Sequence, residues 1–535
     1  MTRDEKKTQS VAIVGAGAAG LTALFELLQT KKDGSTSLKY NADGSFDAAG
    51  SVNDNPAFGG IVLFEQSEKV GGVWNPSFDD PDVIPQDILD TERYDDPFVL
   101  RPKTEVPKEF EGQSFEEPLR KPIDSTEKLP IKWNRSAIYK SLYSNVTKRH
   151  LRNSFIPFEG PSEEKESPIG SFLTNFQVTD NLLKFVKTHS LDQYVRTQSE
   201  VVDISKSPDH KQWVVTVRQV NSGDNTESWY SQTFDKVIIS TGHYSIPHVP
   251  KIEGLSKWNK ESPNSVLHAK SFRDESIFKD KRVVFVGTGL SGIDILQYAF
   301  PLAKEVIVAR TPGKKEIYDW LVTAAGSKDI VVKPRVASVD YGDTKTVTFV
   351  DGTKTEDVDI LVFSTGYHWH YPFLNQRDTG VYVRTGEGEG QEGGLVANNN
   401  SLVDGIYKSL FAVKDSSLAF VGVLTTQFKW PSFELASSII AAVWSGKSQL
   451  PSVEEREAWF KEREQLRGSN LAVHVYLNGE FADFVNENKS LLPTNRHIKN
   501  VFDTAYVDEE IASQKVAERL FYELKDGSIS VHDTL

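Results

Sequence analysis

Two glycine motifs, each between an apolar run and a helical pattern, constrain the fold of this chain more than any other feature. Gly15-Ala16-Gly17-Ala18-Ala19-Gly20 follows the apolar run Ser10–Gly15 and opens a helical pattern over Ala18–Thr30. Gly287-Thr288-Gly289-Leu290-Ser291-Gly292 follows Val283–Val286 in the same way. In this context the first glycine allows a tight turn, the second lets a pyrophosphate approach the backbone, and the third lets helix and strand pack closely. The pattern predicts an α/β fold with two dinucleotide-binding, Rossmann-like domains.

The residue that ends the next strand distinguishes the two motifs. Glu65 follows the strand-like run Ile61–Phe64, and a carboxylate there accepts hydrogen bonds from ribose hydroxyls. The polar segment 31–59, read as a surface insertion, accounts for the long spacing from Gly20 to Glu65. After the second motif, the strand Glu305–Ala309 ends at Arg310, which suits a 2′-phosphate. Lys314 and Lys315 add positive charge nearby, so we expect NADPH at the second motif.

Two dinucleotide sites in one chain indicate hydride transfer from a nicotinamide to a flavin. The chain has no cysteine, so it cannot pass electrons to a dithiol, and oxygen is the remaining acceptor. The only methionine is Met1. Because Met and Leu exchange at little cost in stability, a selective cause for this composition is favoured over packing. The alternatives are sulfur sparing, protection from leaked peroxide, and deliberate removal of sulfur.

Charge and hydropathy exclude two other classes of function. The net charge is −14 without a basic run, which argues against a nucleic-acid partner. The longest apolar stretch, Leu435–Trp444, is too short to span a bilayer. No apolar segment follows the charged residues at the N-terminus, so we expect no secretory signal and a cytoplasmic location.

Periodicity places further elements along the chain. We expect strands within 194–240, a strand over Asp359–Ser364 and another over Leu418–Gly422. The helical patterns cover Ser136–Arg149, Val178–His189, Pro431–Trp444, 452–467 and 508–524. Residues 76–131 are polar, Pro-rich and acidic, and are interpreted as an irregular surface insertion.

Further motifs identify a family. These are Gly71-Gly72-Val73-Trp74, Tyr139-Lys140-Ser141-Leu142-Tyr143-Ser144-Asn145, His268-Ala269-Lys270-Ser271-Phe272, and the two Thr-Gly segments Ser240–Tyr244 and Phe363–Tyr367, the second followed by Pro372-Phe373-Leu374. In this order they resemble the flavin-containing monooxygenases, class B flavoproteins. Ser144 replaces a threonine of the pattern, and Ser262 and Asn264 replace the Phe and Gly that open the motif ending in His268–Phe272.

The resemblance implies an FAD domain interrupted by an NADPH domain. The FAD domain would comprise 1–243, with insertions near 31–59 and 76–131, and 366–535 with the C-terminal helices. The NADPH domain would be 244–365, between the two Thr-Gly crossings. The implied reaction reduces FAD with NADPH, adds O₂ to give a C4a-hydroperoxyflavin, and oxygenates a soft nucleophile, either sulfur or nitrogen. The lack of Cys and Met suggests an organosulfur substrate and synthesis of the enzyme when sulfur is scarce.

The resemblance also implies site residues. Asn145 is the expected catalytic residue, because an amide donates and accepts hydrogen bonds without changing charge. The start of the helix at Pro431 is expected to face the flavin pyrimidine. The expected cofactor-binding residues are Gly15, Gly17, Ala18, Ala19, Gly20, Glu65, Gly72, Val73, Trp74, Ser144, Val202, Thr241, Gly242, Gly287, Gly289, Ser291, Gly292, Arg310, Thr365 and Gly366.

Three other functions stay open at this point. A Baeyer–Villiger enzyme acting on ketones is disfavoured by Phe272, where a tryptophan would be expected. The others are an NADPH oxidase that releases H₂O₂ and a non-catalytic dinucleotide sensor. His368-Trp369-His370 is interpreted as part of a pocket loop, not as a metal pair, because no further ligands accompany it. The substrate, and whether the chain forms a homodimer, are left open.

Overall fold

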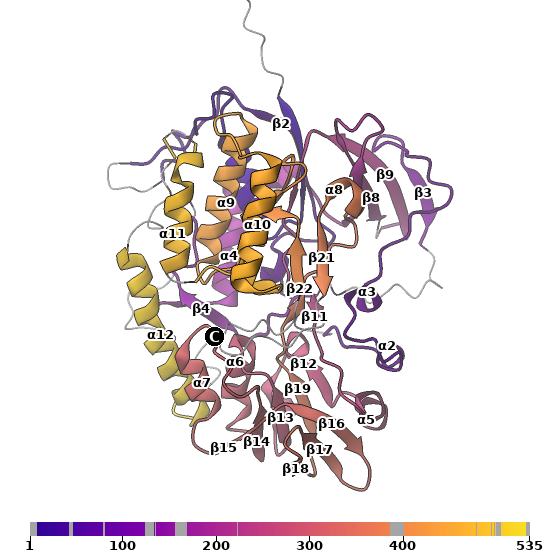
Figure 1. The fold of residues 1–535 in the computed structure, drawn as a ribbon, viewed down its shortest axis with the longest axis vertical. Coiled ribbons are helices and arrows are strands. Elements are labelled where there is room, and N and C mark those ends of the chain that lie inside the picture. The colour runs from indigo at the N-terminus through magenta and orange to yellow at the C-terminus, as the bar shows by residue number, and fades with distance from the viewer. Residues whose placement is uncertain are drawn as a thin grey trace, which may run out of the picture.

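The computed structural model describes residues 8–41, 46–76, 78, 81–123, 133, 135–155, 168–221, 223–385, 401–477, 479–493, 495–496, 498 and 504–530. The parts of the two expected insertions at 42–45, 77, 79–80 and 124–131 lie outside the described residues. Figure 1 shows two stacked halves, each built on a largely parallel sheet, so the predicted α/β class is confirmed.

The upper half is built on a seven-stranded sheet whose central strands are parallel. Its strands, in spatial order, are β23 (Ile406–Tyr407), β24 (Phe411–Ala412), β25 (Leu418–Phe420), β10 (Lys236–Ile239), β1 (Gln9–Val14), β2 (Phe58–Phe64) and β6 (Val195–Arg196). Alternate residues of β1 face opposite layers, because side chains of a strand alternate between faces. Val11 and Ile13 pack with the helices, whereas Ala12 and Val14 pack with an antiparallel sheet.

The two layers that cover this sheet differ in kind. One face is covered by α1 (Ala18–Gln29), α4 (Asn175–Thr188) and α9 (Lys429–Trp444). The other is covered by the antiparallel sheet of β3 (Leu119–Pro122), β9 (Thr226–Phe234), β8 (Trp213–Asn221) and β7 (Ser199–Lys206). Thr174 and Gln177 form a capping box at the start of α4, which fixes where that helix begins.

The lower half repeats the three-layer arrangement. Its parallel sheet has the order β12 (Val266–His268), β19 (Ile360–Phe363), β13 (Arg282–Val286), β14 (Glu305–Ala309) and β15 (Ile330–Lys333). One face packs on α6 (Leu290–Ala299) and α7 (Asp319–Ala325). The other packs on α5 (Leu255–Glu261) and the antiparallel strands β16 (Val336–Tyr341), β17 (Lys345–Phe349) and β18 (Lys354–Thr355). All these elements come from the predicted 244–365 segment.

The chain passes between the halves on one antiparallel pair. Strands β11 (Ile246–Pro247) and β20 (Tyr367–His368) each follow a Thr-Gly segment and pair Ile246 with His368 and Pro247 with Tyr367. The remaining elements are β4 (Tyr143–Thr147), β5 (Phe172–Thr174), β21 (Tyr382–Thr385), β22 (Ser401–Asp404), α2 (Gln86–Leu89), α3 (Pro97–Leu100), α8 (Gln376–Thr379), α10 (Val453–Arg467), α11 (Gly479–Asn488) and α12 (Thr504–Lys525).

The C-terminal helix α12 crosses from one half to the other (Figure 1). Towards the lower half, Tyr318 Oη donates to Glu510 at 2.6 Å and Trp320 Nε1 donates to Gln514 Oε1 at 3.2 Å. Towards the upper half, Gln514 Nε2 donates to the Asn145 carbonyl at 3.2 Å. One amide side chain of α12 therefore bonds both halves.

Two expectations on local structure were wrong. The predicted helix Ser136–Arg149 is absent, and its second half forms β4, which pairs with β5 at Tyr143 and Thr174. The run Tyr-Ser-Asn-Val-Thr has weak helix propensity, and pairing outweighs the apparent periodicity. The described part of 31–59 is also less superficial than expected, because Leu38 is buried in the core beside α1.

A buried ion cluster joins distant parts of the upper half. The Arg496 guanidinium lies 2.6 Å from Glu26 Oε1 of α1 and also pairs with Glu434 of α9. All three side chains are at most 1% exposed. Burial raises the pKa of Glu26 despite the neighbouring cation. This cluster links α1, α9 and the segment after α11, and Arg496 also donates to Tyr40 of the 31–59 segment.

Candidate functional site: two nucleotide cradles and the space between them

Each glycine motif lies against the Thr-Gly segment of its own half. Gly15 has φ 101° and would place a Cβ 2.7 Å from the Ser240 carbonyl oxygen, so only glycine fits. Gly20 would place a Cβ 1.9 Å from the Gly15 oxygen. The Ser240 hydroxyl donates within 2.9 Å of the Val14 and Gly15 carbonyls, although it can bond fully to only one at a time. The turn at Gly15 and the first turn of α1 are thus packed tightly against the Ser240 segment.

The same arrangement recurs in the lower half. Gly287 has φ 94° and would place a Cβ 2.6 Å from the Ser364 carbonyl oxygen. Gly292 would place one 2.9 Å from the Gly287 oxygen and 3.0 Å from Ser364 Cβ. The first and third glycines of both motifs are therefore required by the packing of the protein itself.

The middle glycines behave differently, because the protein leaves room for a side chain there. A Cβ on Gly289 would meet no atom within 4 Å, and one on Gly17 would come no closer than 3.6 Å to Gly72. Both residues immediately precede a helix, α6 and α1, and have extended backbone that any residue adopts. Space that packing does not fill, at a helix N-terminus, fits the pyrophosphate of a dinucleotide.

We call the motif Gly15–Gly20 with the N-terminus of α1 the first cradle, and Gly287–Gly292 with the N-terminus of α6 the second cradle. The segment Gly71-Gly72-Val73-Trp74 lies against the first cradle. Gly17 and Gly71 form a parallel bridge, and a Cβ on Gly72 would lie 2.9 Å from Gly17 Cα. The Val73 carbonyl accepts a hydrogen bond from Ser136, and the Trp74 carbonyl accepts one from Thr179 at 2.7 Å. The two adjacent glycines thus let this segment approach the backbone of the first glycine motif. The hydrogen bonds from Ser136 and Thr179 hold Trp74 half-buried at the edge of the core.

Glu65 lies at the first cradle as expected, but its two oxygens already accept backbone hydrogen bonds. Ala16 N donates to Oε2 at 2.8 Å and Ser67 N donates to Oε1 at 2.9 Å. Burial raises the pKa of Glu65 against these hydrogen bonds. Each carboxylate oxygen keeps a second lone pair, so the residue can hold the turn and also accept from ribose hydroxyls.

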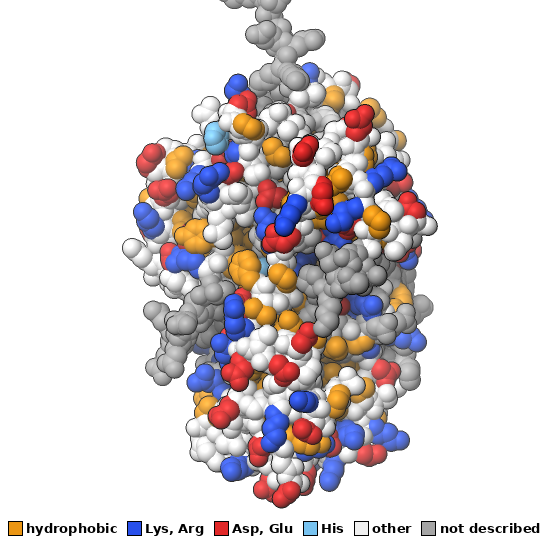
Figure 2. All heavy atoms as spheres, turned by 90° about the vertical axis from the view of Figure 1, so that its right-hand side faces the viewer, with side chains coloured by type: hydrophobic (Ala, Val, Ile, Leu, Met, Phe, Trp, Pro, Cys, Tyr) orange, Lys and Arg blue, Asp and Glu red, His pale blue; other side chains and the backbone are white. Residues whose placement is uncertain are grey.

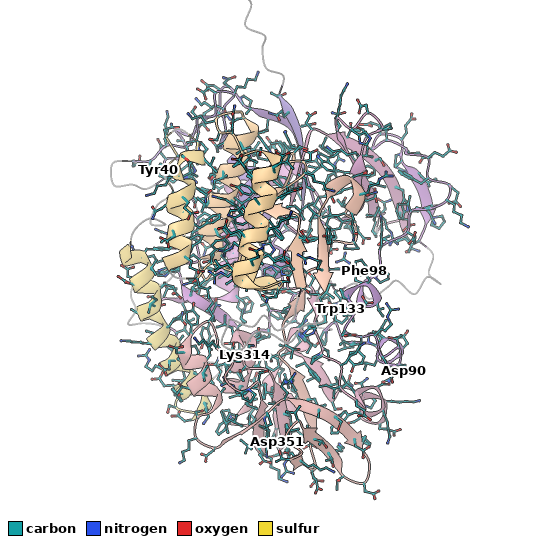
Figure 3. The ribbon with its side chains drawn as sticks, viewed as in Figure 1. Tyr40, Asp90, Phe98, Trp133, Lys314 and Asp351 are labelled. Atoms are coloured by element: carbon teal, nitrogen blue, oxygen red, sulfur yellow. The ribbon has the colours of Figure 1, made fainter. Side chains whose placement is uncertain are left out.

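Arg310 lies beside the second cradle, and its side chain donates hydrogen bonds to two backbone carbonyls. The guanidinium donates to Lys314 O at 3.1 Å and Val322 O at 3.4 Å. Lys314 also lies near a carboxylate, at 3.4 Å from Glu316 Oε1, and that carboxylate accepts from the Thr288 hydroxyl of the fingerprint at 3.1 Å. Figure 3 places Lys314 at the edge of the lower half that faces the upper half. Glu316 was not predicted, and it offsets the positive charge here.

Each Thr-Gly segment carries a buried hydroxyl without a hydrogen-bond partner among the described residues, Thr241 in the first and Ser364 in the second. Thr365 instead donates to the His248 carbonyl. A buried hydroxyl without a partner costs stability, so Thr241 is available to a ligand. Gly242 next to it has φ 68° and open space around a built Cβ.

Several residues near the crossings are exposed to solvent. Tyr244, which ends the first Thr-Gly segment, is 47% exposed. Gly72, Asn145, Gly242 and Ser291, all predicted from the sequence, are also exposed.

Ser144 and Asn145 are placed on a strand instead of the expected helix. The Ser144 hydroxyl donates to Val146 O at 2.7 Å and accepts from Leu173 N at 2.9 Å, so it stabilises β4 and is not free for a cofactor in this geometry. The Asn145 side chain is exposed while its carbonyl is bonded to α12. Val202 is buried at an irregularity in the pairing of β7 with β8.

The motif around His268, of which only the second half matches the family pattern, contacts the second crossing. His268 Nε2 lies 3.0 Å from the Gly366 carbonyl, and the buried ring of Phe272 meets Tyr139 edge-on at 4.7 Å. The motif thereby joins the lower half to the segment that leads into β4. Its two matching residues keep their structural contacts although the opening Phe and Gly positions differ.

The histidines around the second crossing are held neutral. Burial lowers the pKa of His368 to about 3 and that of His370 to about 4. His370 Nε2 is bonded to the Arg101 carbonyl at 2.7 Å, and the His368 ring lies 4.9 Å from that of His248. Within the described residues, no group of three or more His, Asp or Glu side chains could hold a metal ion.

Besides Glu316, two charged residues at the site, Asp294 and Lys429, were missed by the sequence analysis. Asp294 of α6, two residues after Gly292, has a buried oxygen without a hydrogen-bond partner in the described chain, and burial raises its pKa to about 7. Lys429 is the first residue of α9. The sequence offered a signal for each. Asp294 is a carboxylate directly after a glycine motif, and Lys429 is a cation at a helix start, where cations are disfavoured.

Comparisons with known proteins show which family the chain matches. The family model described as flavin-binding monooxygenase-like matches residues 129–339 and 326–512. A flavin-containing monooxygenase of Arabidopsis thaliana, FMO GS-OX5, is 26% identical over 490 residues, covering 90% of this chain and 85% of that protein.

Two solved structures share the fold across nearly the whole chain. S-allyl-L-cysteine S-oxygenase from Allium sativum superposes with a TM-score of 0.60 at 22% identity, covering 98% of this chain and 95% of that one. Tmm from Pelagibacter gives a TM-score of 0.56 at 18% identity, covering 96% and 90%.

The chain belongs to the flavin-binding monooxygenase-like family, as the sequence motifs predicted. It is an oxidoreductase of the flavin-dependent monooxygenase class, and its cofactors are FAD and NADPH. The part of the chain that the structure describes contains no helix long and apolar enough to cross a membrane. On the face in Figure 2, acidic and basic side chains lie interspersed.

Proposed function

We propose that this enzyme oxygenates the sulfur atom of a small organosulfur compound. The single observation that carries the choice of sulfur is the composition of the chain, which has no cysteine and no methionine after Met1. A relative of the same fold is named as an S-oxygenase acting on S-allyl-L-cysteine, which supports the same class of substrate. The overall reaction takes substrate, O₂, NADPH and one proton to the S-oxide, water and NADP⁺.

We assign FAD to the cradle of α1 and NADPH to the cradle of α6. Support comes from Glu65, which suits ribose hydroxyls, and from Arg310, which suits a 2′-phosphate. The corresponding domains are 1–243 with 366–535 for FAD and 244–365 for NADPH. When bound, FAD supplies the activation of oxygen, and the protein supplies binding, orientation and electrostatics.

The residues of this chain would act mainly by orientation. Gly17 and Gly289 leave room for the two pyrophosphates, and the Thr241 hydroxyl can donate to the first dinucleotide. We propose Asn145 as the catalytic residue, with its exposed amide directed to the reacting groups and its carbonyl held by Gln514. The histidines at the second crossing, His368 and His370, carry no positive charge at neutral pH, because burial lowers their pKa values to about 3 and about 4.

Sparing of sulfur gives the composition a physiological meaning. Replacing Met by Leu costs under about 1.5 kcal/mol, so the absence of sulfur imposes little loss of stability. An enzyme that oxidises scarce organic sulfur compounds, as a step before other reactions break their carbon–sulfur bonds, would profit from containing no sulfur itself. We propose that it is made when sulfur is limiting and that it acts in the cytoplasm.

The experiment compares substrates and expression. Purified holoenzyme is mixed with NADPH and equal concentrations of a thioether, a thiol, a sulfonate, a tertiary amine and a cyclic ketone, and NADPH loss, H₂O₂ and oxygenated product are quantified. We expect S-oxide or another S-oxygenated product in near-equal amount to NADPH consumed. Turnover of amine alone would refute the sulfur proposal, ketone-to-ester conversion would indicate the Baeyer–Villiger alternative, and H₂O₂ with every compound would indicate an oxidase.

Expression is measured in cells grown on replete sulfate and in cells starved of sulfur. We expect more of the protein in the starved cells. Equal amounts in both, with no turnover of any sulfur compound, would refute the scavenging role.

A further inference from the structure

Lys429 occupies a position that a cation normally avoids. It is the first residue of α9, whose N-cap Phe428 provides no side-chain hydrogen bond. Unbonded N–H groups give a helix N-terminus a partial positive charge, so a lysine there is disfavoured. Sequences usually place Asp or Glu in the first turn instead.

The surroundings of Lys429 do not neutralise its charge. Its Nζ lies 3.4 Å from the Leu424 carbonyl and 3.4 Å from Thr425 Oγ1, both long contacts to uncharged oxygens. Among the described residues, no carboxylate lies within 4.0 Å, and desolvation lowers the pKa of Lys429 to about 7. Lys429 is partly buried, and withdrawing a cation from water without a neighbouring anion is unfavourable.

The start of α9 lies close to the first cradle. Gly422, between β25 and α9, would place a Cβ 3.7 Å from Phe433 of α9 and 4.0 Å from Ala19 of α1. The first turns of α9 and α1 are therefore neighbours at the carboxyl edge of the sheet. Burial lowers the pKa of His243 in the first Thr-Gly segment, and the charge of Lys429 lowers it further.

An anion bound beside Lys429 would offset both the missing counter-charge and the unfavourable position at the helix N-terminus. The pyrophosphate of FAD is assigned to the N-terminus of α1, which leaves the isoalloxazine as the second place where FAD becomes negative. Transfer of a hydride from NADPH adds two electrons and one proton to that ring, and its pyrimidine edge takes the net negative charge. NADPH becomes NADP⁺ in the same step.

We propose that Lys429 faces the pyrimidine edge of the isoalloxazine and stabilises the negative charge that reduction places there. Lys429 adds a full charge where the helix offers only a partial one. The inference rests on FAD as the resident cofactor and is independent of the sulfur substrate. It makes Lys429 a residue that sets how readily the flavin is reduced.

Sulfite binding to the oxidised holoenzyme tests this without NADPH, O₂ or substrate. Sulfite adds to the oxidised ring and leaves a negative charge on the same edge, so its affinity reports on stabilising cations. We expect Lys429→Met to raise the Kd of sulfite at least tenfold and Lys429→Arg to stay within threefold of wild type. The two-electron potential of the Met variant should fall by about 30 mV per tenfold change in reduction equilibrium.

Lys236→Met is a matched control, because Lys236 is also partly buried with a lowered pKa but begins β10, at the opposite edge of the sheet. It should leave sulfite binding and potential unchanged. Unchanged sulfite affinity and potential in Lys429→Met would overturn the proposal, even if the KM of a carboxylated thioether rose, since that result would assign Lys429 to the substrate.

A measurement on the wild type covers the case in which Lys429→Met fails to hold FAD. The absorption spectrum of the reduced holoenzyme is followed against pH under anaerobic conditions. We expect the bound reduced flavin to take up its proton at least one pH unit below free reduced flavin. Protonation at the same pH as free flavin would show that no cation acts on that edge, and the proposal would fail.

Discussion

Replacing the middle and last glycines of the second fingerprint separates ligand binding from folding. The structure gives the two positions opposite requirements although they are three residues apart. A Cβ on Gly289 meets nothing within 4 Å, whereas one on Gly292 would lie 2.9 Å from the Gly287 oxygen and 3.0 Å from Ser364 Cβ. Alanine therefore adds a methyl group to open space at position 289 and to occupied space at position 292.

The expected changes in stability follow from these distances. At Gly289 the backbone has φ −66° and ψ 178°, which alanine adopts freely. Lower entropy of the unfolded chain gains about 0.4–1 kcal/mol, and the poorer N-cap costs about 0.5–1 kcal/mol, so the two nearly cancel. At Gly292 overpacking costs about 1–3 kcal/mol. At about 2–4 °C per kcal/mol, Tm should fall by about 2–12 °C in Gly292→Ala and change by under about 2 °C in Gly289→Ala.

Binding should follow the reverse order. The methyl group of Gly289→Ala occupies the space assigned to the pyrophosphate, so we expect the Kd of NADP⁺ to rise at least tenfold, or about 1.4 kcal/mol. Tm is measured without NADP⁺, and Kd by titration calorimetry of the FAD-loaded enzyme. Wild-type NADP⁺ affinity in Gly289→Ala, or wild-type stability in Gly292→Ala, would refute the division of roles between the glycines.

Three further predictions concern single side chains. Arg310→Ala should lower the preference for NADPH over NADH in kcat/KM by one to two decades, because a charge-assisted bond is worth about 1.5–3 kcal/mol; an unchanged ratio would remove Arg310 from the phosphate site. Asn145→Ala should keep bound FAD and its reduction by NADPH but release more H₂O₂, and an unaltered yield of product per NADPH would contradict its catalytic role. Arg496→Met should cost about 3–5 kcal/mol, because two buried carboxylates lose their cation, and a denaturant midpoint equal to that of wild type would refute this account.

The two strand–turn–helix units with their glycine motifs could be predicted from the sequence because their determinants are local. The turn at Gly15 and the turn at Gly287 depend on residues close in the chain and on a buried strand before them. The two Thr-Gly segments were recognisable as motifs, but not their contact with the glycines. The Ser240 carbonyl lies close to Gly15 because β1 pairs with β10, and the Ser364 carbonyl lies close to Gly287 because β13 pairs with β19. These pairings join residues far apart in the sequence.

Long-range contacts account for what the sequence did not predict. The strand β4 forms because Phe172–Thr174 lies alongside it, which a helical pattern over 136–149 cannot indicate. The pair of Glu26 and Arg496 joins positions 470 residues apart. Glu316 reaches Thr288 across 28 residues, so the charge around the second cradle could not be counted from Arg310, Lys314 and Lys315 alone.

The single amide of Gln514 makes α12 a mechanical coupling between the halves of the molecule. It accepts from Trp320 in the lower half and donates to the carbonyl of Asn145 in the upper half. A rotation of the lower half relative to the upper half would therefore either move the backbone of Asn145 or break this link. The position of the lower half and the backbone of the residue proposed as catalytic are thus tied to one side chain in the middle of α12.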